Sequence, residues 1–393
     1  MSGNAKAQFY RQPRYYNSFS CIGGSCPMSC CLIWRVDWTK DEVEKLKNAE
    51  CSDELRTLID SSFEPFKDNP EKFMIKMDEK KRCPFLTEDN FCSIQRELGA
   101  EYLSNTCTVY PRNARLSGNT ILSYCNLSCY HIMDMLCNDK DCMILENYRP
   151  AAKKSGRATT DNDIDIMNHP ELKYRHQLFE FFYEIISDDS RIVEASITLG
   201  ALAAQSISKL ISKGAYDKIP ESITALKKQL KNPEQVKKLE QIRPNYAVKF
   251  GFLNELNKIV IKSNVMDMIS ENGAISVNKY NFGLEKFRSD FAERPFALRN
   301  IALNLLLECK MPFRDKNYSF FENYCYYAAA FAAIKLIASA VYASGDAPEK
   351  DFKVSSAYIS RFFAHDDFKV NQILDVFKEL NCMSPAYIAL IVN

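Results

Sequence analysis

The sequence predicts a mainly α-helical protein in two parts: a cysteine-rich N-terminal domain with short β-hairpins and a larger all-helical C-terminal domain. Twelve of the 15 cysteines lie between Cys21 and Cys142, among short segments of alternating apolar and polar residues. In the rest of the chain, apolar residues recur at the three- and four-residue spacing of helices. We therefore place a cysteine-rich metal or cluster domain at residues 17–147, a linker at 148–165 and a helical domain at 166–393.

The composition is that of a soluble globular protein, with 46% hydrophobic and 26% charged residues and a net charge of +1. Because the charges nearly cancel, no global positive field attracts nucleic acid or an anionic membrane, and we expect neither as a partner. Residues 1–16 lack the apolar run of a secretory signal. We expect a cytoplasmic protein that works as a monomer.

The most apolar segment runs from Cys325 to Val341 and is rich in alanine, with Lys335 in its middle. A membrane-spanning helix needs about 20 predominantly apolar residues. Because this segment is shorter and carries a charge, we expect a buried helix of a soluble protein. A membrane span is the alternative.

The cysteine-rich part shows both helical and alternating patterns. We expect a flexible lead-in with exposed aromatic side chains at residues 1–20. Apolar residues have helical spacing over residues 39–63, where Thr39 and Glu42 have the form of a capping box. Residues 73–78 alternate, which predicts a strand. The other predicted elements are a hairpin at 83–94, a short helix at 95–103, a hairpin at 114–124 and a helix at 128–136 capped by Ser128.

The helical part contains a series of apolar stripes that fit the core-facing side of helices. Gly214 follows one of these stripes as an expected C-cap. These apolar stripes indicate a helical domain and do not indicate a catalytic or binding function. The predicted helices are 170–187, 191–213, 221–231, 233–262, 282–292, 295–309, 318–344, 351–363 and 370–380.

The cysteine spacings indicate a metal site. Thiolates are good ligands for soft metals, and a turn rich in Gly and Pro lets several sulfurs converge. We expect four thiolates of a set of eight to hold the metal, and buried structural thiols are the alternative. Zinc, which prefers paired cysteines, and an iron–sulfur cluster, which needs about four thiolates, both fit. The eight candidate ligands are Cys21, Cys26, Cys30, Cys31, Cys83, Cys92, Cys107 and Cys129.

Other catalytic signatures are absent from the sequence. It has no Cys-x3-Cys-x2-Cys pattern, no Gly-x-Gly-x-x-Gly at a strand–helix junction, no Walker loop and no Gly-x-Ser-x-Gly elbow. The four histidines are scattered, which is more typical of surface or core histidines than of a catalytic base. The sequence therefore does not indicate dinucleotide binding, nucleotide hydrolysis or serine-hydrolase chemistry.

Several motifs stand in a defined order: Phe19-Ser-Cys-Ile-Gly-Gly-Ser-Cys, then Cys83-Pro-Phe-Leu, then Cys107-x-x-Tyr-Pro-Arg112, then Leu127-Ser-Cys129. Together they resemble the flagellin lysine-N-methylase family over about residues 17–135. They also resemble, more faintly, a broader group of iron- or zinc-chelating cysteine domains. The family resemblance implies a cytoplasmic enzyme that methylates the ε-amine of surface lysines on flagellin. It also implies S-adenosylmethionine as methyl donor and a Cys-bound 4Fe-4S iron–sulfur cluster. After Cys129, where the family has Pro-Glu, this chain has Tyr-His.

The predicted function is therefore protein-lysine N-methylation, with flagellin as the partner. A lysine must lose its proton before it attacks a methyl sulfonium, and positioning and desolvation promote this without a strong base. Tyr110 and Arg112 are candidates for orienting substrate or cofactor; a structural turn whose arginine pairs with a carboxylate is the alternative. The rival functions are a non-enzymatic zinc- or iron-chelating interaction module and a redox or thiol-transfer protein.

Overall fold

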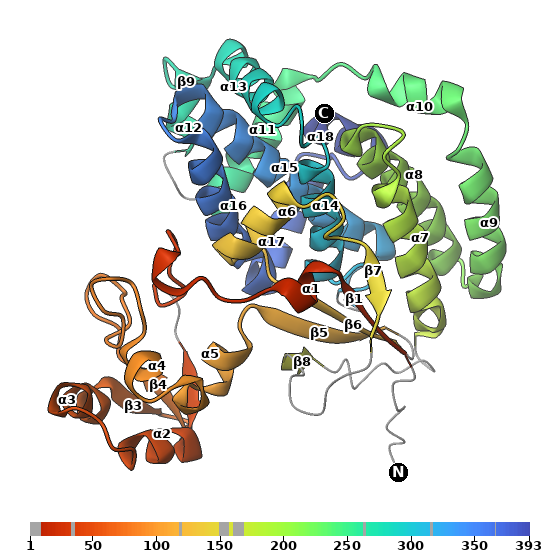
Figure 1. Cartoon of the computed structure of the whole chain (residues 1–393). Coiled ribbons are helices and arrows are strands. Elements are labelled where there is room, and N and C mark those ends of the chain that lie inside the picture. Colours follow the sequence, from red (N-terminus) through yellow and green to blue (C-terminus); the bar gives the residue numbers. More distant parts are fainter. Residues whose placement is uncertain are drawn as a thin grey trace.

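The structure is mainly helical, with 61% helix and small sheets, which confirms the predicted class at that level. Figure 1 shows a large helical body above a sheet, with a smaller unit of helices and strands beside it. A metal-binding role for the cysteine-rich part stays a prediction. The computed structural model describes residues 9–32, 36–117, 120–148, 157–159, 169–261, 265–314, 317–365 and 367–393.

A five-stranded sheet lies under the helical body (Figure 1). In order across the sheet, its strands are β7 (Leu145–Asn147), β1 (Phe9–Pro13), β6 (Thr120–Cys125), β5 (Arg112–Ser117) and β8 (Arg157–Thr159). β5 and β6 form an antiparallel hairpin, whereas β1 runs parallel to β6. This confirms the predicted hairpin at 114–124, whose turn residues 118–119 lie outside the described residues.

The prediction of a flexible lead-in over residues 1–20 is wrong for the part that the structure describes. β1 begins at Phe9, and helix α1 (Tyr15–Ser18) follows it. Tyr15 is fully buried. Its hydroxyl accepts the N–H of Cys125 at 2.9 Å and donates to Oδ1 of Asn304 at 2.5 Å. The segment is ordered because this ring enters the core and its hydroxyl group finds partners there.

The smaller unit has its own three-stranded sheet, in the order β2-β4-β3, covered by short helices. The predicted capping box is confirmed, because the Thr39 hydroxyl accepts the N–H of Glu42 and the Glu42 carboxylate accepts the N–H of Thr39. The elements of this unit are β2 (Asp37–Thr39), α2 (Lys40–Lys47), α3 (Asp53–Ser62), β3 (Phe63–Phe66), β4 (Asn69–Ile75), α4 (Ser93–Glu97) and a 3₁₀ turn (Ala100–Tyr102).

Two predictions about helices in the N-terminal half are corrected. The helix expected over 39–63 is two helices, because Ser52 starts a new one by accepting the N–H of Leu55 at 3.2 Å. Helix α6 (Tyr130–Asn138) starts later than expected and has no side-chain cap. The Ser128 hydroxyl, the expected cap, instead bonds to the Tyr110 hydroxyl at 3.1 Å. Helix α5 (Asn105–Val109) lies between the two units.

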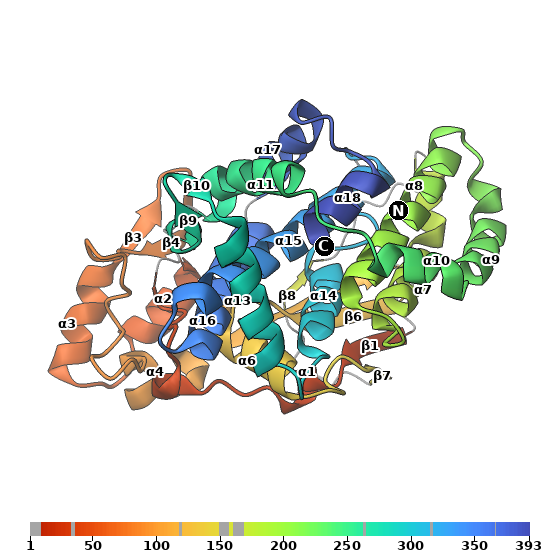
Figure 2. The same ribbon diagram turned by 90° about the horizontal axis from the view of Figure 1, so that it is seen from above.

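The helical body is organised around α15 (Phe320–Ser344), which is buried along almost its whole length. In Figure 2, α13, α16 and α18 surround α15. It is the one helix of the described residues long and apolar enough to cross a membrane, and its most apolar stretch is wholly buried inside the protein. The other helices are α7 (Arg175–Ser187), α8 (Val193–Ser212), α9 (Ile219–Gln229), α10 (Pro233–Glu240), α11 (Tyr246–Leu256), α12 (Val265–Met268), α13 (Val277–Asp290), α14 (Ala297–Glu308), α16 (Pro348–His365), α17 (Asp367–Glu379) and α18 (Pro385–Val392).

The helix predicted over 233–262 is interrupted. α10 ends at Glu240, and α11 starts two residues after Pro244, whose ring cannot continue a helix. α11 then runs into a π-helical turn over Asn257–Ile261. The small ribbon of β9 (Ser270–Glu271) and β10 (Ala274–Ile275) was not predicted, and neither was α18.

Buried side chains divide into two cores. The small core, defined here by Trp38, Leu46, Ile59, Phe85 and their buried neighbours, belongs to the smaller unit. The large core joins α1, β6 and α6 to the helical body. Thus α6 packs with the helical body although we predicted it in the other domain. The domain boundaries stay a prediction, since most of residues 148–165 lies outside the described residues.

Candidate functional site

The eight candidate cysteines come from four separate segments of the chain. Cys21 and Cys26 flank a 3₁₀ turn over Gly23–Ser25, and Cys30 and Cys31 end the same segment. Gly23 has φ +55°, and a Cβ atom there would lie 2.9 Å from the Phe91 ring, so the turn requires glycine. The other candidate cysteines are Cys83 and Cys92 around a tight loop, Cys107 in α5 and Cys129 at the start of α6.

Cys31 is the centre of this group. It accepts hydrogen bonds from the thiols of Cys30 and Cys83, and these bonds lower the pKa of Cys31. The same bonds raise the pKa values of Cys30 and Cys83. The backbone supports the arrangement, because the N–H of Cys83 donates to the carbonyl of Cys31 at 2.8 Å. Three sulfurs from two distant segments therefore share one hydrogen-bonded group.

The remaining thiols surround that group. Cys107 interacts electrostatically with Cys31 and Cys92, and burial raises its pKa to about 12. Cys129 interacts with Cys26 and Cys21, and burial raises its pKa to about 12 as well. The structure thus brings all eight predicted cysteines into one neighbourhood, called the cysteine cluster below.

The cysteine cluster does not have the geometry of a metal site in the structure. Among the described residues, no three His, Cys, Asp or Glu side chains are placed so that they could together hold a metal ion. The donor chemistry suits a soft metal, since thiolate sulfur is the preferred ligand of zinc and iron–sulfur clusters. The positions of these side chains do not form a site that could hold a metal ion among the described residues.

Of the two predicted catalytic residues, Tyr110 lies beside the cysteine cluster, and Arg112 binds Phe19, two residues before Cys21. Tyr110 interacts electrostatically with Cys129, and burial raises the pKa of its hydroxyl group. Arg112 donates to the carbonyl of Phe19 at 2.8 Å, and its guanidinium lies 4.8 Å from the centre of the Phe19 ring. Arg112 therefore holds the end of α1 through a carbonyl and a ring.

Sequence reasoning missed Arg361, which reaches the cysteine cluster from α16. It is 7% exposed and donates to the carbonyl of Leu32 at 3.3 Å. It interacts electrostatically with Tyr110 and Cys30, while burial lowers its pKa. Nothing in the local sequence distinguishes this arginine from others on a helix. Only its tertiary position makes it a part of the cluster.

The helical body contains a second candidate site, a cleft of about 1580 Å³. Its walls come from α7, α8, α10, α13, α14 and the turns between them, with residues 140–144 contributed by the N-terminal half. Sequence reasoning missed the cleft because its lining is drawn from many segments. The polar run Asp188-Asp-Ser-Arg191 between two helical patterns was the one available signal.

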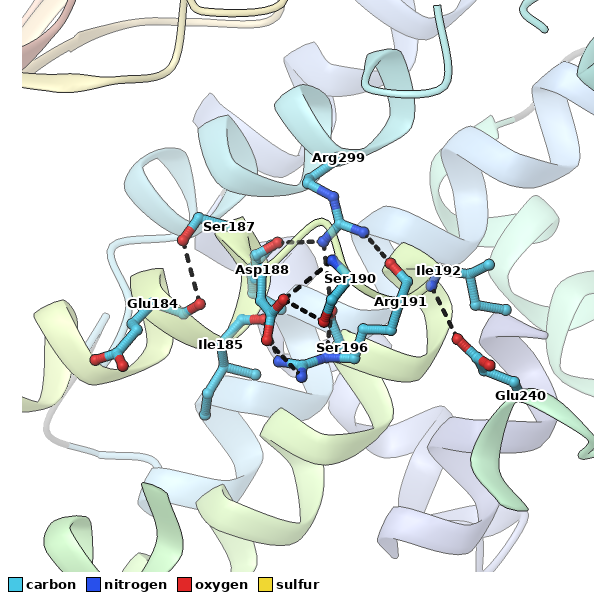
Figure 3. A network of polar contacts seen from close by, with 11 residues as sticks. Glu184, Ile185, Ser187, Asp188, Ser190, Arg191, Ile192, Ser196, Glu240 and Arg299 are labelled. Atoms are coloured by element: carbon cyan, nitrogen blue, oxygen red, sulfur yellow. Dashed lines mark hydrogen bonds and ion pairs between the residues drawn. The ribbon is translucent and has the colours of Figure 1, made fainter. Parts of the chain in front are cut away.

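A polar network fixes the turn at residues 188–192, which forms one wall of the cleft (Figure 3). Arg191 pairs with Asp188 at 2.7 Å and donates to Ser196 Oγ at 3.1 Å. Arg299 donates to the carbonyls of Ile186, at 2.6 Å, and of Arg191. Both guanidinium groups are thus engaged by the protein itself, and they hold the turn in place.

The sequence profile of the FliB lysine N-methylase C-terminal domain matches residues 179–391, more than half of the chain. The chain belongs to the FliB lysine N-methylase family. The match confirms the family that the N-terminal motifs resemble, and it lies in the other half of the chain. Within this FliB-family chain, the matched segment supplies Arg361 and nearly all of the cleft's walls.

Three relatives in Salmonella are similar to this FliB-family chain. The flagellar biosynthetic protein FliU of Salmonella muenchen is 30% identical over 146 residues, which are 37% of this chain and 86% of the relative. The lysine-N-methylases of Salmonella typhimurium and Salmonella choleraesuis are 27% and 26% identical over 251 residues, 62% of this chain. The match spans 59% of the length of each methylase. No solved structure matches the chain significantly.

Proposed function

We propose that the protein is an S-adenosylmethionine-dependent lysine N-methyltransferase that acts on surface lysines of flagellin. The observation that carries the proposal is that nearly all of the cleft's walls lie in the part of the chain matching the FliB lysine N-methylase C-terminal domain. The name of the flagellar relative supports a flagellar substrate. We propose that the protein acts as a monomer in the cytoplasm, where unassembled flagellin and the methyl donor are both present.

The reaction joins a lysine nitrogen to the methyl carbon of a sulfonium. The lysine ammonium first loses a proton to water, because only the neutral amine has a lone pair to donate. The nitrogen then bonds to the methyl carbon while the sulfur–carbon bond breaks. The electrons of that bond stay on sulfur, and neutral S-adenosylhomocysteine leaves. The protein contributes by positioning the amine and by limiting its contact with water.

The test is to incubate the purified protein with flagellin and S-adenosylmethionine and to weigh the flagellin by mass spectrometry. We expect mass increases of whole methyl groups, which peptide mapping assigns to lysines. Flagellin with acetylated lysines is the matched control and should gain nothing. If flagellin gains no mass while the protein is folded and the donor intact, the proposed function is wrong.

We also propose that the cysteine cluster holds a 4Fe-4S cluster, with zinc as the alternative metal. The support is that thiols from four segments lie together and that hydrogen bonds from neighbouring thiols lower the pKa of Cys31. A thiolate-bound metal would join these segments and contribute its positive charge to them. Cys30→Ser and Cys107→Ser should lower the bound metal, whereas Cys51→Ser, outside the eight, should not.

Measuring which metal the purified protein contains distinguishes iron from zinc. Together with the methylation assay, it also distinguishes an enzyme from a non-enzymatic chelating module. Iron bound to thiolates gives a brown protein, whereas zinc leaves it colourless. A colourless protein that binds zinc and does not methylate flagellin would favour the non-enzymatic chelating module. Full metal content in both the Cys30→Ser and Cys107→Ser variants would contradict the ligand assignment.

Tyr110 and Arg112 are proposed to orient substrate or cofactor beside the cysteine cluster. Tyr110→Phe removes the hydroxyl that bonds to Ser128 and keeps the ring. Arg112→Lys keeps the charge, but a lysine cannot reproduce the planar guanidinium on the Phe19 ring. We expect both variants to methylate flagellin more slowly while remaining folded. Wild-type rates in both would leave these residues with structural roles only.

A further inference from the structure

The cleft in the helical body has an acidic rim. We propose that this rim and the apolar surface beside it dock a cationic, lysine-bearing segment of the protein substrate. The inference rests on the proposed function and names where the substrate is bound. Three features of the cleft favour such a partner: its buried polar groups, its rim charges and its exposed apolar surface.

The buried polar groups of the cleft already have partners within the protein. Arg191 and Arg299 bind carbonyls and side chains of the 188–192 turn. Buried Glu194 pairs with Lys335 at 2.7 Å, and the Asn300 amide donates to the carbonyls of Leu136 and Asp139. Small-molecule sites instead place free polar groups in the pocket to orient the ligand. The interior of this cleft offers few of them.

The charges that remain free lie on the rim. Glu285 and Glu293 are exposed, and the structure shows no ion pair or hydrogen bond for their carboxylates among the residues it describes. Asp189 is also exposed, and it interacts electrostatically with Arg299. Glu240 accepts only the backbone N–H of Ile192, at 3.3 Å. These four carboxylates come from different elements around the cleft: the 188–192 turn, α10, α13 and the turn before α14.

Positive charges on the lining are fewer and more engaged. Arg294 forms a two-bond pair with Glu349, and both of its bonds are 2.8 Å long. Arg288 lies 3.9 Å from Glu194. Among the described residues, Lys140 is the one exposed lining cation for which the structure shows no ion pair or hydrogen bond. Free carboxylates thus outnumber free cations, which favours a positively charged partner.

The cleft also exposes apolar surface to such a partner. Ile144 is 44% exposed and Ile192 is 45% exposed. Ile144 comes from the N-terminal half of the chain, and Ile192 comes from the helical part. Tyr246 and Phe296 are half-buried in the lining. Apolar side chains bind the aliphatic part of a lysine and its neighbours, and aromatic rings attract its ammonium group. A volume of about 1580 Å³ suits a peptide segment better than one small molecule, whose sites measure roughly 300–1,000 Å³.

The test measures binding without any methyl donor, so that it does not depend on catalysis. The full-length protein is titrated against a short fluorescent peptide with one central lysine, and against the same peptide with acetyl-lysine. We expect the lysine peptide to bind more tightly and to weaken with added salt. The double variant Glu285→Gln, Glu293→Gln should weaken its binding roughly two- to fivefold, the size expected for exposed ion pairs.

Two control variants make the result specific to the cleft. Glu379→Gln removes an exposed carboxylate from the end of α17, outside the cleft, and should leave binding unchanged. Lys140→Gln removes a cation from the rim and should tighten binding. Equal binding of both peptides, or no response to the rim variants, would overturn the inference.

The donor itself provides the last arm of the experiment. If S-adenosylmethionine displaces the peptide competitively, the cleft is a donor site and the inference is wrong. If the peptide binds as expected but flagellin is never methylated, the docking inference stands and the proposed function fails. If flagellin is methylated but peptide binding does not depend on charge, the proposed function stands and the docking inference fails.

Discussion

The two hydrophobic cores are built in different ways. The small core draws its buried side chains from one continuous stretch, from Trp38 to Ile94. The large core joins segments far apart in the sequence, from Tyr15 through α6 to Val392 (Figure 1). A unit held by contacts within one stretch can unfold locally while the rest of the protein stays folded. Unfolding of the large core instead breaks contacts between many distant segments at once. We expect the small unit to be the less stable of the two.

The cysteine cluster lies between these cores. Cys83 belongs to the small core, with Cys31 and Cys92 packed against it, whereas Cys129 packs against the large core. A metal held by thiols from both sides would therefore tie the small unit to the helical body. Metal binding would then stabilise the position of the small unit, because a ligand that binds only the assembled form favours it.

The buried ion pair in the large core should give the largest effect. Lys335 lies inside α15, donates to Glu194 at 2.7 Å and to the carbonyl of Val392 at 2.6 Å, and is 1% exposed. Lys335→Met leaves a buried carboxylate without its partner, which costs about 3–5 kcal/mol of unfolding free energy. Urea unfolding followed by far-UV circular dichroism measures this loss.

The double variant Glu194→Met, Lys335→Met is the control for that experiment. Replacing both charges by apolar side chains of similar size leaves no unpaired charge, so most of the lost stability should return. A double variant as unstable as Lys335→Met would show that the pair matters through packing and not through charge.

A matched pair of leucine substitutions compares the two cores directly. Leu46 in α2 and Leu306 in α14 are both 0% exposed. Each change to alanine should cost about 2–5 kcal/mol, the usual range for a buried leucine. Trp38 is buried in the small core, so in a background that carries Trp34→Phe its fluorescence follows the small unit, while circular dichroism follows the helical body.

The two variants should differ in which signal changes. Leu46→Ala should move the fluorescence transition to lower urea and leave the circular dichroism transition nearly in place. Leu306→Ala should move the circular dichroism transition. If both variants shift both transitions equally, the two cores unfold as one unit and the comparison fails.

Periodicity and caps predicted the fold well where a segment's own residues decide its structure. The capping box at Thr39, the 114–124 hairpin and most helices of the body follow from local patterns. β1 was missed because its strand conformation depends on pairing with β6 and on partners for Tyr15 that come from distant segments. Local sequence carries little of that information.

The candidate site also has a part that the sequence predicted and a part that it did not. Residue type and spacing identified eight cysteines that the structure places together. Spacing did not identify Arg361 or the cleft, because both arise from the packing of helices whose individual patterns only indicate a core face. A site built from the ends of many helices has no compact motif for a sequence search to find.

A buried carboxyl group in the large core gives a prediction for pH. Glu308 at the end of α14 is 2% exposed and accepts the N–H of Leu127 at 3.2 Å. Burial raises its pKa to about 8. The folded state therefore keeps a proton that the unfolded state loses near its ordinary pKa of about 4.3. The stability from this group is complete below that value and falls by about 1.4 kcal/mol per pH unit as pH rises toward 8.

Glu308→Gln tests this prediction. Glutamine keeps an acceptor for Leu127 but cannot ionise, so the variant should lose the pH slope and exceed the wild type in stability at pH 8. Circular dichroism unfolding at pH 5, 6.5 and 8 measures the slope for both proteins. An unchanged slope in the variant would assign the pH dependence to other groups.

The smallest predicted effect compares two capping boxes, one in each core. Thr39 with Glu42 starts α2 in the small unit, and Ser319 with Glu322 starts α15 in the helical body. Alanine at either cap leaves an N–H group of the first turn unpaired and costs about 1 kcal/mol. Thr39→Ala should lower the fluorescence transition, because its helix has eight residues and buries two of them, Val43 and Leu46. Ser319→Ala should cost less, since α15 is buried from its first turn, where Phe320 and Phe321 anchor it independently of the cap. Equal losses at the two positions would show that burial does not compensate for a lost cap, and that both helices depend on their first turn alike.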